Sequence, residues 1–169
     1  TIELSYRVEN AADYSEDIIT MASALTSDFV GARIKPTNVL LHSSLLKTDD
    51  LVQSYNTKDE ELVHMVITIV QNYKRIGNLA QVYVNGSKKC SFEWSNADTF
   101  AHEGKLVLGS ATADLYVYKM RVYTSAFEWT SAAQNFISCL PDTASKKAAY
   151  DKIMSVINDG YQLDFDKVK

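Results

Sequence analysis

The stretch Gln81–Trp94, QVYVNGSKKCSFEW, decides the fold of this chain. In its first half Tyr83 and Asn85 alternate with two valines, which is the period of a half-buried strand. The dipeptide Asn85-Gly86 then suits a type I′ turn, because both central residues of that turn need a positive φ. A second short run, Cys90–Trp94, follows the turn. The stretch therefore predicts a β-hairpin.

Short strands account for most of the chain before Tyr123. The longest run, Leu62–Val70, is rich in β-branched residues, as expected of a central strand that is covered on both faces. Turn signals separate the runs, a pattern typical of a sandwich or barrel. Besides the hairpin strands Gln81–Asn85 and Cys90–Trp94, the predicted strands are Ile2–Val8, Asp17–Ala24, Phe29–Lys35, Val39–Ser43, Leu62–Val70, Leu106–Gly109 and Asp114–Tyr123.

Helical spacing replaces this alternation after Tyr123. Thr130 or Ser131 is the expected N-cap of a first helix, and Pro141 ends it. We expect Trp129 to dock this helix onto the strands. The apolar positions that recur at the helical period are Ala132, Ala133, Phe136, Ile137 and Leu140.

A second helix is predicted after the proline. Asp142 or Thr143 is its expected N-cap, and Asn158-Asp159-Gly160 is its expected end, because these residues tolerate the left-handed conformation. Residues 161–169 then form a tail that serves as a linker or as a strap across the strands. The apolar face of this helix consists of Ala149, Tyr150, Ile153, Met154 and Ile157.

Composition excludes two classes of partner. The 169 residues carry a formal net charge of −4, whereas a general nucleic-acid binder needs a basic face. No apolar run approaches the ~20 residues that cross a bilayer, and no signal peptide is visible. The chain opens on Thr-Ile-Glu-Leu without an initiator Met. We therefore expect a module of a larger chain, oligomeric or not, that binds neither nucleic acid nor membrane.

Four segments resemble the laminin-G-like, or concanavalin A-like, jelly roll. That family has a strand before a "v-Y-v-N-G" hairpin, a short "l-l-G-s" strand, and a last "d-l-y-x-x-R-v-Y" strand that leads into a short helix. The resemblance implies an all-β antiparallel sandwich over residues 1–125, two short C-terminal helices over 126–160, and the tail 161–169. The matching segments are His64–Val70, Gln81–Gly86, Lys105–Ser110 and Asp114–Tyr123.

The C-terminal half is also similar to modules in large structural proteins of tailed phages of gut bacteria. The similarity lies in the order Asn-Phe-Ile, a Pro-Asp stop, a Lys-rich helix, Asn-Asp-Gly and a final Asp-x-Asp-Lys-Val-Lys. It implies a virion protein of a tail or fibre, made in the host cytoplasm. An extracellular or cell-surface protein is the alternative.

One strand of the laminin-G pattern is missing at the start of the chain. Laminin-G modules usually begin one strand before Thr-Ile-Glu-Leu, so the resemblance implies a sheet edge that needs cover. We expect either the tail, Tyr161–Val168, or a partner to cover it.

No arrangement of residues predicts catalysis. The related glucanases carry Glu-x-Asp-x-x-Glu on one strand, so that acid and nucleophile face one cleft, and this chain lacks that pattern. Glu93 and Asp98 flank Trp94 at a spacing that fits a solvated turn. No Gly-x-Ser-x-Gly elbow accompanies the three histidines, and His64 is expected to be a packed, hydrogen-bonded core residue. The chain is therefore predicted not to be an enzyme.

Metal ligands are sparse as well. Cys90 and Cys139 lie far apart, and no His or Cys stands at zinc spacing, so both are expected to be reduced structural thiols. We predict no cofactor and no metal site. Calcium is the one ion left open, because the laminin-G and legume-lectin relatives often hold it. Its candidate ligands are the Asn96–Asp98 loop and Asp114, which lack the oxygen density of a dedicated calcium loop.

A sugar site needs an exposed aromatic ring for C–H groups and planar amides or carboxylates for hydroxyls. The hairpin gathers such groups, although aromatic side chains also fill sandwich cores, and both interpretations stay open. Tyr116 and Tyr118 share a face of the last strand, where core or interface packing is expected. The predicted glycan-binding residues are Tyr83, Asn85, Trp94, Asn96 and Asp98.

Two functions follow from these features. The first is a non-catalytic carbohydrate-binding or adhesion module that contacts host-surface glycans. The second is an architectural module that contacts a neighbouring virion protein and binds no sugar. A binding module should expose Trp94 or another aromatic ring beside Asn96 or Asp98, whereas an architectural module should bury those rings or present a large apolar patch.

Overall fold

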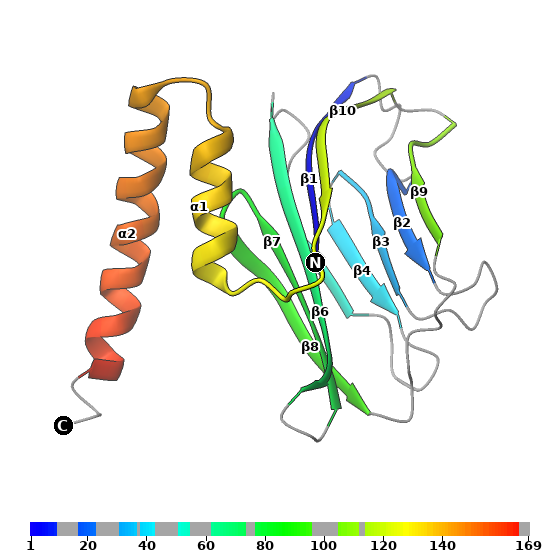
Figure 1. Ribbon diagram of the computed structural model, residues 1–169, viewed down its shortest axis with the longest axis horizontal. Coiled ribbons are helices and arrows are strands. Elements are labelled where there is room, and N and C mark those ends of the chain that lie inside the picture. The colour runs from blue at the N-terminus through cyan, green and yellow to red at the C-terminus, as the bar shows by residue number, and fades with distance from the viewer. Residues whose placement is uncertain are drawn as a thin grey trace.

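The computed structural model describes residues 1–9, 17–22, 31–36, 38–42, 51–54, 62–73, 77–95, 105–111 and 114–165. They form two facing antiparallel sheets and two helices outside them (Figure 1). Sheet A contains, in spatial order, β10 (Asp114–Val122), β1 (Ile2–Glu9), β6 (Val63–Tyr73), β7 (Gly77–Val84) and β8 (Ser87–Ser95). Sheet B contains β5 (Leu51–Ser54), β4 (Asn38–His42), β3 (Gly31–Ile34), β2 (Ile19–Ala22) and β9 (Lys105–Leu108). The helices are α1 (Trp129–Cys139) and α2 (Thr143–Phe165).

This architecture confirms the predicted fold class, an all-β antiparallel sandwich followed by C-terminal helices. Each predicted strand has a counterpart, and β6 lies at the centre of sheet A between β1 and β7, as its β-branched run indicated. β5 is not among the predicted strands. It has the sequence Leu-Val-Gln-Ser and lies at an edge of sheet B. Its two apolar residues stand next to each other, so it shows no alternation of apolar and polar residues.

The predicted hairpin is formed by β7 and β8, and its turn has the expected geometry. Asn85 has a φ of 49° and Gly86 a φ of 75°, the pair of positive angles that a type I′ turn requires. The Asn85 Oδ1 accepts the backbone N–H of His64 at 2.9 Å, and the Asn85 N–H donates to the His64 carbonyl at 2.8 Å. The turn therefore closes the β7–β8 hairpin and is also hydrogen-bonded to β6.

Gly86 also lets both helices approach the hairpin. A Cβ at this position would lie 3.0 Å from Ile153 Cδ1 of α2 and 3.1 Å from Phe136 Cδ1 of α1. Glycine thus meets two requirements here, since it adopts a positive φ without strain and leaves room for neighbouring side chains.

The main core lies between the two sheets. Because strand side chains alternate between faces, every second residue of β1, β6 and β7 points inward. The buried members of this cluster are Leu4, Tyr6, Val8, Ile18, Ile19, Ile34, Val63, Met65, Ile67, Ala80, Val82 and Val84.

The outer face of sheet A is covered as well. α1 packs over β6 and β8, and α2 lies outside α1 (Figure 1). Ala132 of α1 is buried against Val66 and Tyr83, with Phe127 and Trp129 packed around them. The predicted docking role of Trp129 is therefore confirmed. As a result, polar residues on this face, such as Glu3 and His64, are enclosed between sheet and helix.

The helix starts differ partly from the prediction. The N-cap of α1 is Glu128, which makes no side-chain capping bond, so the prediction of Thr130 or Ser131 is wrong. Asp142 does cap α2, since the backbone N–H of Ser145 donates to its Oδ1 at 2.8 Å.

The second helix is longer than predicted. α2 runs through Asn158-Asp159-Gly160 and ends at Phe165, because a single glycine costs a helix only about 1 kcal/mol and cannot end it alone. Residues 161–165 are therefore helical, and the prediction that they cover a sheet edge is wrong; residues 166–169 lie outside the described part. Neither helix, within the residues described, is long and apolar enough to cross a bilayer.

Candidate functional site

A groove of about 790 Å³ opens where β10 meets the corner between α1 and α2. It contains apolar side chains from the helical corner, together with an aromatic ring, an ammonium group, an amide and hydroxyls. The residues that characterise it are Ser5, Asn85, Tyr118, Lys119, Phe136 and Cys139. The groove therefore combines the apolar and polar groups that small-ligand sites require.

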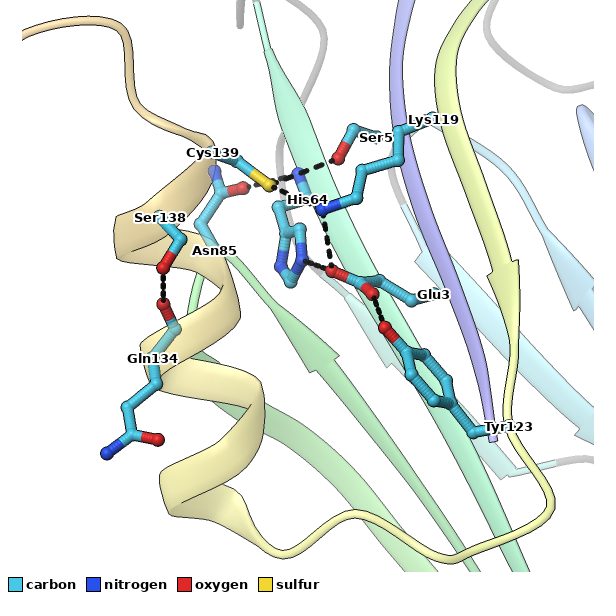
Figure 2. A network of polar contacts seen from close by, with 9 residues as sticks. All are labelled: Glu3, Ser5, His64, Asn85, Lys119, Tyr123, Gln134, Ser138 and Cys139. Atoms are coloured by element: carbon cyan, nitrogen blue, oxygen red, sulfur yellow. Dashed lines mark hydrogen bonds and ion pairs between the residues drawn. The ribbon is translucent and has the colours of Figure 1, made fainter.

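Behind the groove, a network of polar side chains lies between sheet A and α1 (Figure 2). At its centre is the buried carboxylate of Glu3 on β1. Its Oε1 lies 2.8 Å from His64 Nε2, and its Oε2 accepts the Tyr123 hydroxyl at 2.5 Å. Lys119 Nζ lies 3.6 Å from Oε1. His64 is thus a packed, hydrogen-bonded residue, as the sequence predicted.

This network fixes the charges of its members. Burial alone would raise the pKa of Glu3, but hydrogen bonds from Tyr123 and His64, together with the charge of Lys119, lower that pKa below its ordinary value. Burial lowers the pKa of His64 despite the opposing effect of Glu3. Glu3 is therefore an anion at neutral pH and His64 a neutral imidazole. Because a carboxylate only accepts hydrogen bonds, His64 Nε2 carries the proton that it shares with Glu3.

Cys139, the last residue of α1, connects the network to the groove. Its Sγ lies 3.6 Å from Lys119 Nζ and 3.7 Å from Ser5 Oγ. Cys139 is a half-buried free thiol, as predicted, while the side chain of Cys90 lies outside the described residues. Lys119 therefore stands between a buried carboxylate and a thiol, with its side chain 28% exposed at the groove.

Tyr118 owes its position to an irregularity in β10. Ser5 pairs with Lys119 and Tyr6 with Val117, so Tyr118 is an extra residue on the β10 side. Such a bulge re-aims side chains at a sheet edge. Tyr118 consequently faces the groove beside Lys119, with 57% of its surface exposed.

Tyr116 is 45% exposed, and the Arg7 guanidinium carbon lies 5.3 Å from the centre of its ring. The expectation of core packing is therefore wrong for both Tyr116 and Tyr118. The alternative expectation, that they form an interface, stays a prediction.

The predicted glycan residues do not assemble as a site in the described part of the chain. Tyr83 is only 2% exposed beneath α1, and its hydroxyl donates to Gln81 Oε1 at 3.0 Å. Its ring therefore has no free face for a sugar, which removes it from the predicted set. Asn85 does reach the groove, although its Oδ1 is engaged by β6.

Trp94 belongs to β8, where its backbone pairs with Asn78. Its side chain lies outside the described residues, as do Asn96 and Asp98. The calcium site predicted as an option around Asn96–Asp98 falls outside them too. Exposure of the Trp94 ring would distinguish a glycan-binding role from an architectural one, and the glycan-binding role of Trp94 therefore stays a prediction.

Sequence reasoning missed the groove residues Tyr118, Lys119 and Cys139 as a group. Lys119 and Cys139 are 20 residues apart, on a strand and at a helix end, and no local spacing relates them. The one signal in the sequence was the alternation of the last strand, but a bulge is not visible in alternation alone.

The described residues also contain one mixed set of metal-ligating side chains. Glu3, His64 and Cys139 each offer a ligand atom, and these atoms lie within 4.8 Å of one another. The three residues come from β1, β6 and α1. The prediction that the chain has no metal site stays a prediction, because side chains that could hold an ion do not show that one binds.

Comparison with known proteins identifies a similar fold. Neither a family model nor a curated protein sequence matches the chain. Among solved structures, the chain is similar to one described as "Botulinum Neurotoxin Type G Receptor Binding Domain", with a TM-score of 0.52 and 18% sequence identity. The match covers 80% of this chain but 36% of the other, so the chain spans about a third of that domain. The likeness shows a shared sandwich fold.

Proposed function

We propose that this chain is a non-catalytic binding module that recognises a carbohydrate in the groove between β10 and the helical corner. The observation that carries the proposal is the exposed ring of Tyr118, which stands beside the ammonium group of Lys119 and the hydroxyl of Ser5.

An aromatic ring offers its face to the C–H groups of a sugar, while nearby donors and acceptors bind its hydroxyls. Tyr118 supplies the ring, and Asn85 and Lys119 supply polar groups within the same groove. The sheet and helices hold these groups on rigid elements. This assignment moves the predicted sugar site from the Trp94 end of the hairpin to its turn.

The fold likeness supports a binding role in the broad sense. The similar solved structure is described as a receptor-binding domain, so the same type of scaffold serves recognition in another protein. Function resides in sites grafted on a fold, and the groove is therefore the part of this chain to test. A tailed-phage virion stays the predicted location of the module, on the likeness of its sequence alone.

A glycan array with wild-type protein and two matched tyrosine variants tests the proposal, with calcium present. Tyr150, on α2, is 52% exposed and does not line the groove. Tyr118→Ala should weaken binding to the recognised glycan by roughly tenfold, the size of a lost aromatic contact of about 1.4 kcal/mol. Tyr150→Ala should bind like wild type. Silence from the wild-type protein, or equal losses in both variants, would contradict the proposal.

A second candidate function is protein–protein contact at the β10 edge. β10 pairs with β1 on one side, and no other described strand pairs with its opposite side. In the described part of the chain, every exposed large hydrophobic side chain except Tyr150 lies on β9 or β10. The group comprises Val107, Leu108, Tyr116, Val117, Tyr118, Met120 and Val122. An unpaired strand edge of this composition invites another strand.

The occupant that this edge fits is a second copy of the chain. β10 carries Asp114 at its start and Arg121 near its end, so antiparallel pairing of two β10 strands brings opposite charges together at both ends. Light scattering should then report a dimer for the wild type and a monomer for Arg121→Glu. The double variant Asp114→Lys/Arg121→Glu should restore the dimer. A wild-type monomer at high concentration would exclude this arrangement.

A further inference from the structure

We propose that Glu3, His64 and Cys139 form a site for Zn²⁺ or a similar transition-metal ion, at the point where the groove meets the polar network. One ligand atom from each residue lies within 4.8 Å of the others. The ligands come from two neighbouring strands and a helix end, so the fold rather than a local motif brings them together. The site lies beside the sugar contact proposed for Tyr118, with Lys119 between the two.

The ligand types select the class of ion. A thiolate, an imidazole and a carboxylate together suit zinc, whereas calcium and magnesium prefer oxygen ligands alone. Bond lengths of about 2.0–2.3 Å place tetrahedral zinc ligands roughly 3.3–3.6 Å apart. The Glu3 Oε1–His64 Nε2 pair is 2.8 Å apart and shares a proton, so an ion would replace that proton and separate the two atoms slightly.

The surroundings orient the ligands. The Tyr123 hydroxyl holds Glu3 Oε2, which leaves Oε1 facing His64 and Cys139. The Asn85 side chain fixes the backbone of His64. Hydrogen-bonded partners of this kind orient metal ligands and strengthen binding. Glu3 and His64 are buried, whereas Cys139 lines the groove and provides a path of entry.

Lys119 is the competitor for this site. Its ammonium group lies 3.6 Å from Glu3 Oε1 and 3.6 Å from Cys139 Sγ, so it already supplies positive charge between two of the ligands. A metal ion must displace it, and the partly exposed lysine side chain can turn into the groove. On binding, the Cys139 thiol releases its proton to solvent, and the single ring proton of neutral His64 moves from Nε2 to Nδ1, which leaves Nε2 free to bind the metal.

Because Lys119 competes with the ion, a variant that removes its charge should bind metal more tightly than wild type. Lys119→Met removes the competing charge and keeps the aliphatic stem, so it should tighten metal binding by at least about tenfold. Cys139→Ser should weaken it by at least about tenfold and remove the thiolate-to-metal absorption. Cys90→Ser is the matched control, because it removes the other cysteine, on β8, and should leave binding unchanged.

The experiment uses the chain stripped of metal by a chelator and titrated first with Co²⁺ and then with Zn²⁺. One Co²⁺ per chain with a thiolate charge-transfer band, displaced by Zn²⁺, is the expected result for wild type and Cys90→Ser. Circular dichroism and unfolding midpoints of each metal-free variant separate loss of a ligand from loss of the fold. A wild type without the thiolate band, a Cys139→Ser variant that binds like wild type, or a Lys119→Met variant that does not bind more tightly would overturn the proposal.

Discussion

Sheet A has two regions that both contain tyrosine but expose its side chain to very different extents. At its centre, β6 and β7 lie under α1, and the Tyr83 ring there is 2% exposed. At its edge, β10 meets only the end of α1 among the contacts described, where Lys119 approaches Cys139, and the Tyr118 ring is 57% exposed. β7 has no charged residue, whereas β10 has three. The strand covered by α1 thus contributes its tyrosine to the core, and the more polar edge strand keeps its tyrosine available for a ligand.

The largest expected effect comes from removing each tyrosine in turn. Tyr83→Ala should lower the free energy of unfolding by about 3–5 kcal/mol, because it empties a buried aromatic site between Val66 and Ala132. Tyr118→Ala should change that free energy by no more than about 0.5 kcal/mol, as expected of an exposed side chain. Urea unfolding of both variants measures the contrast. Equal destabilisation would show that the two regions do not differ in the way that their burial implies.

A smaller effect is expected where the covered region depends on a single glycine. Gly86→Ala should lower the free energy of unfolding by about 1–3 kcal/mol, because the new Cβ strains a positive φ and meets Phe136 and Ile153. Gly109→Ala is the matched control, because Gly109 also has a positive φ, of 98°, but a Cβ there meets nothing within 4 Å, so it measures the backbone strain alone. If Gly86→Ala unfolds at the wild-type urea concentration, the close approach of helices to hairpin is not a constraint.

The smallest effect concerns α2, which lies outside both regions. Hydrogen bonds from the side chain and backbone of Ser145 lower the pKa of Asp142 below its ordinary 3.8. The ionised cap therefore stabilises α2 fully above pH 3.8, and this contribution is lost as the pH falls through the lowered pKa. Helical circular dichroism of wild type should decline slightly over that range. Asp142→Asn caps without titrating, so its signal should lack this component.

Much of the fold could be predicted because its signals are local. The β6 run, the Asn85-Gly86 turn and the helical spacing after Tyr123 each lie within a short window, and each is confirmed. The end of α2 could not be placed, because Gly160 carries a turn signal that the helix overrides. β5 was missed because its sequence, Leu-Val-Gln-Ser, has only two apolar residues and they are adjacent.

The candidate site was harder to predict because its contacts are distant in sequence. His64 could be recognised as a core histidine, but its partner Glu3 is 61 residues away. Cys139 contacts Ser5 across 134 residues. Only the pairing of β1 with β6 and the docking of α1 bring these groups together, and neither follows from a local pattern. Tyr118 is the extra residue of a bulge at the edge of sheet A, a feature of strand pairing that no local pattern shows.

The place of β1 in sheet A has a consequence for how the chain folds. β6, β7 and β8 follow one another in sequence and can pair through short turns, but β1 must lie between β6 and β10. The Glu3 carboxylate accordingly gains its hydrogen bond from Tyr123, 120 residues later in the chain, only when β10 is in place. Contacts so remote in sequence slow folding. We therefore expect refolding of sheet A to begin with the β6–β8 meander and to finish with β1. During synthesis, β1 can be paired on both sides only after β10 has left the ribosome.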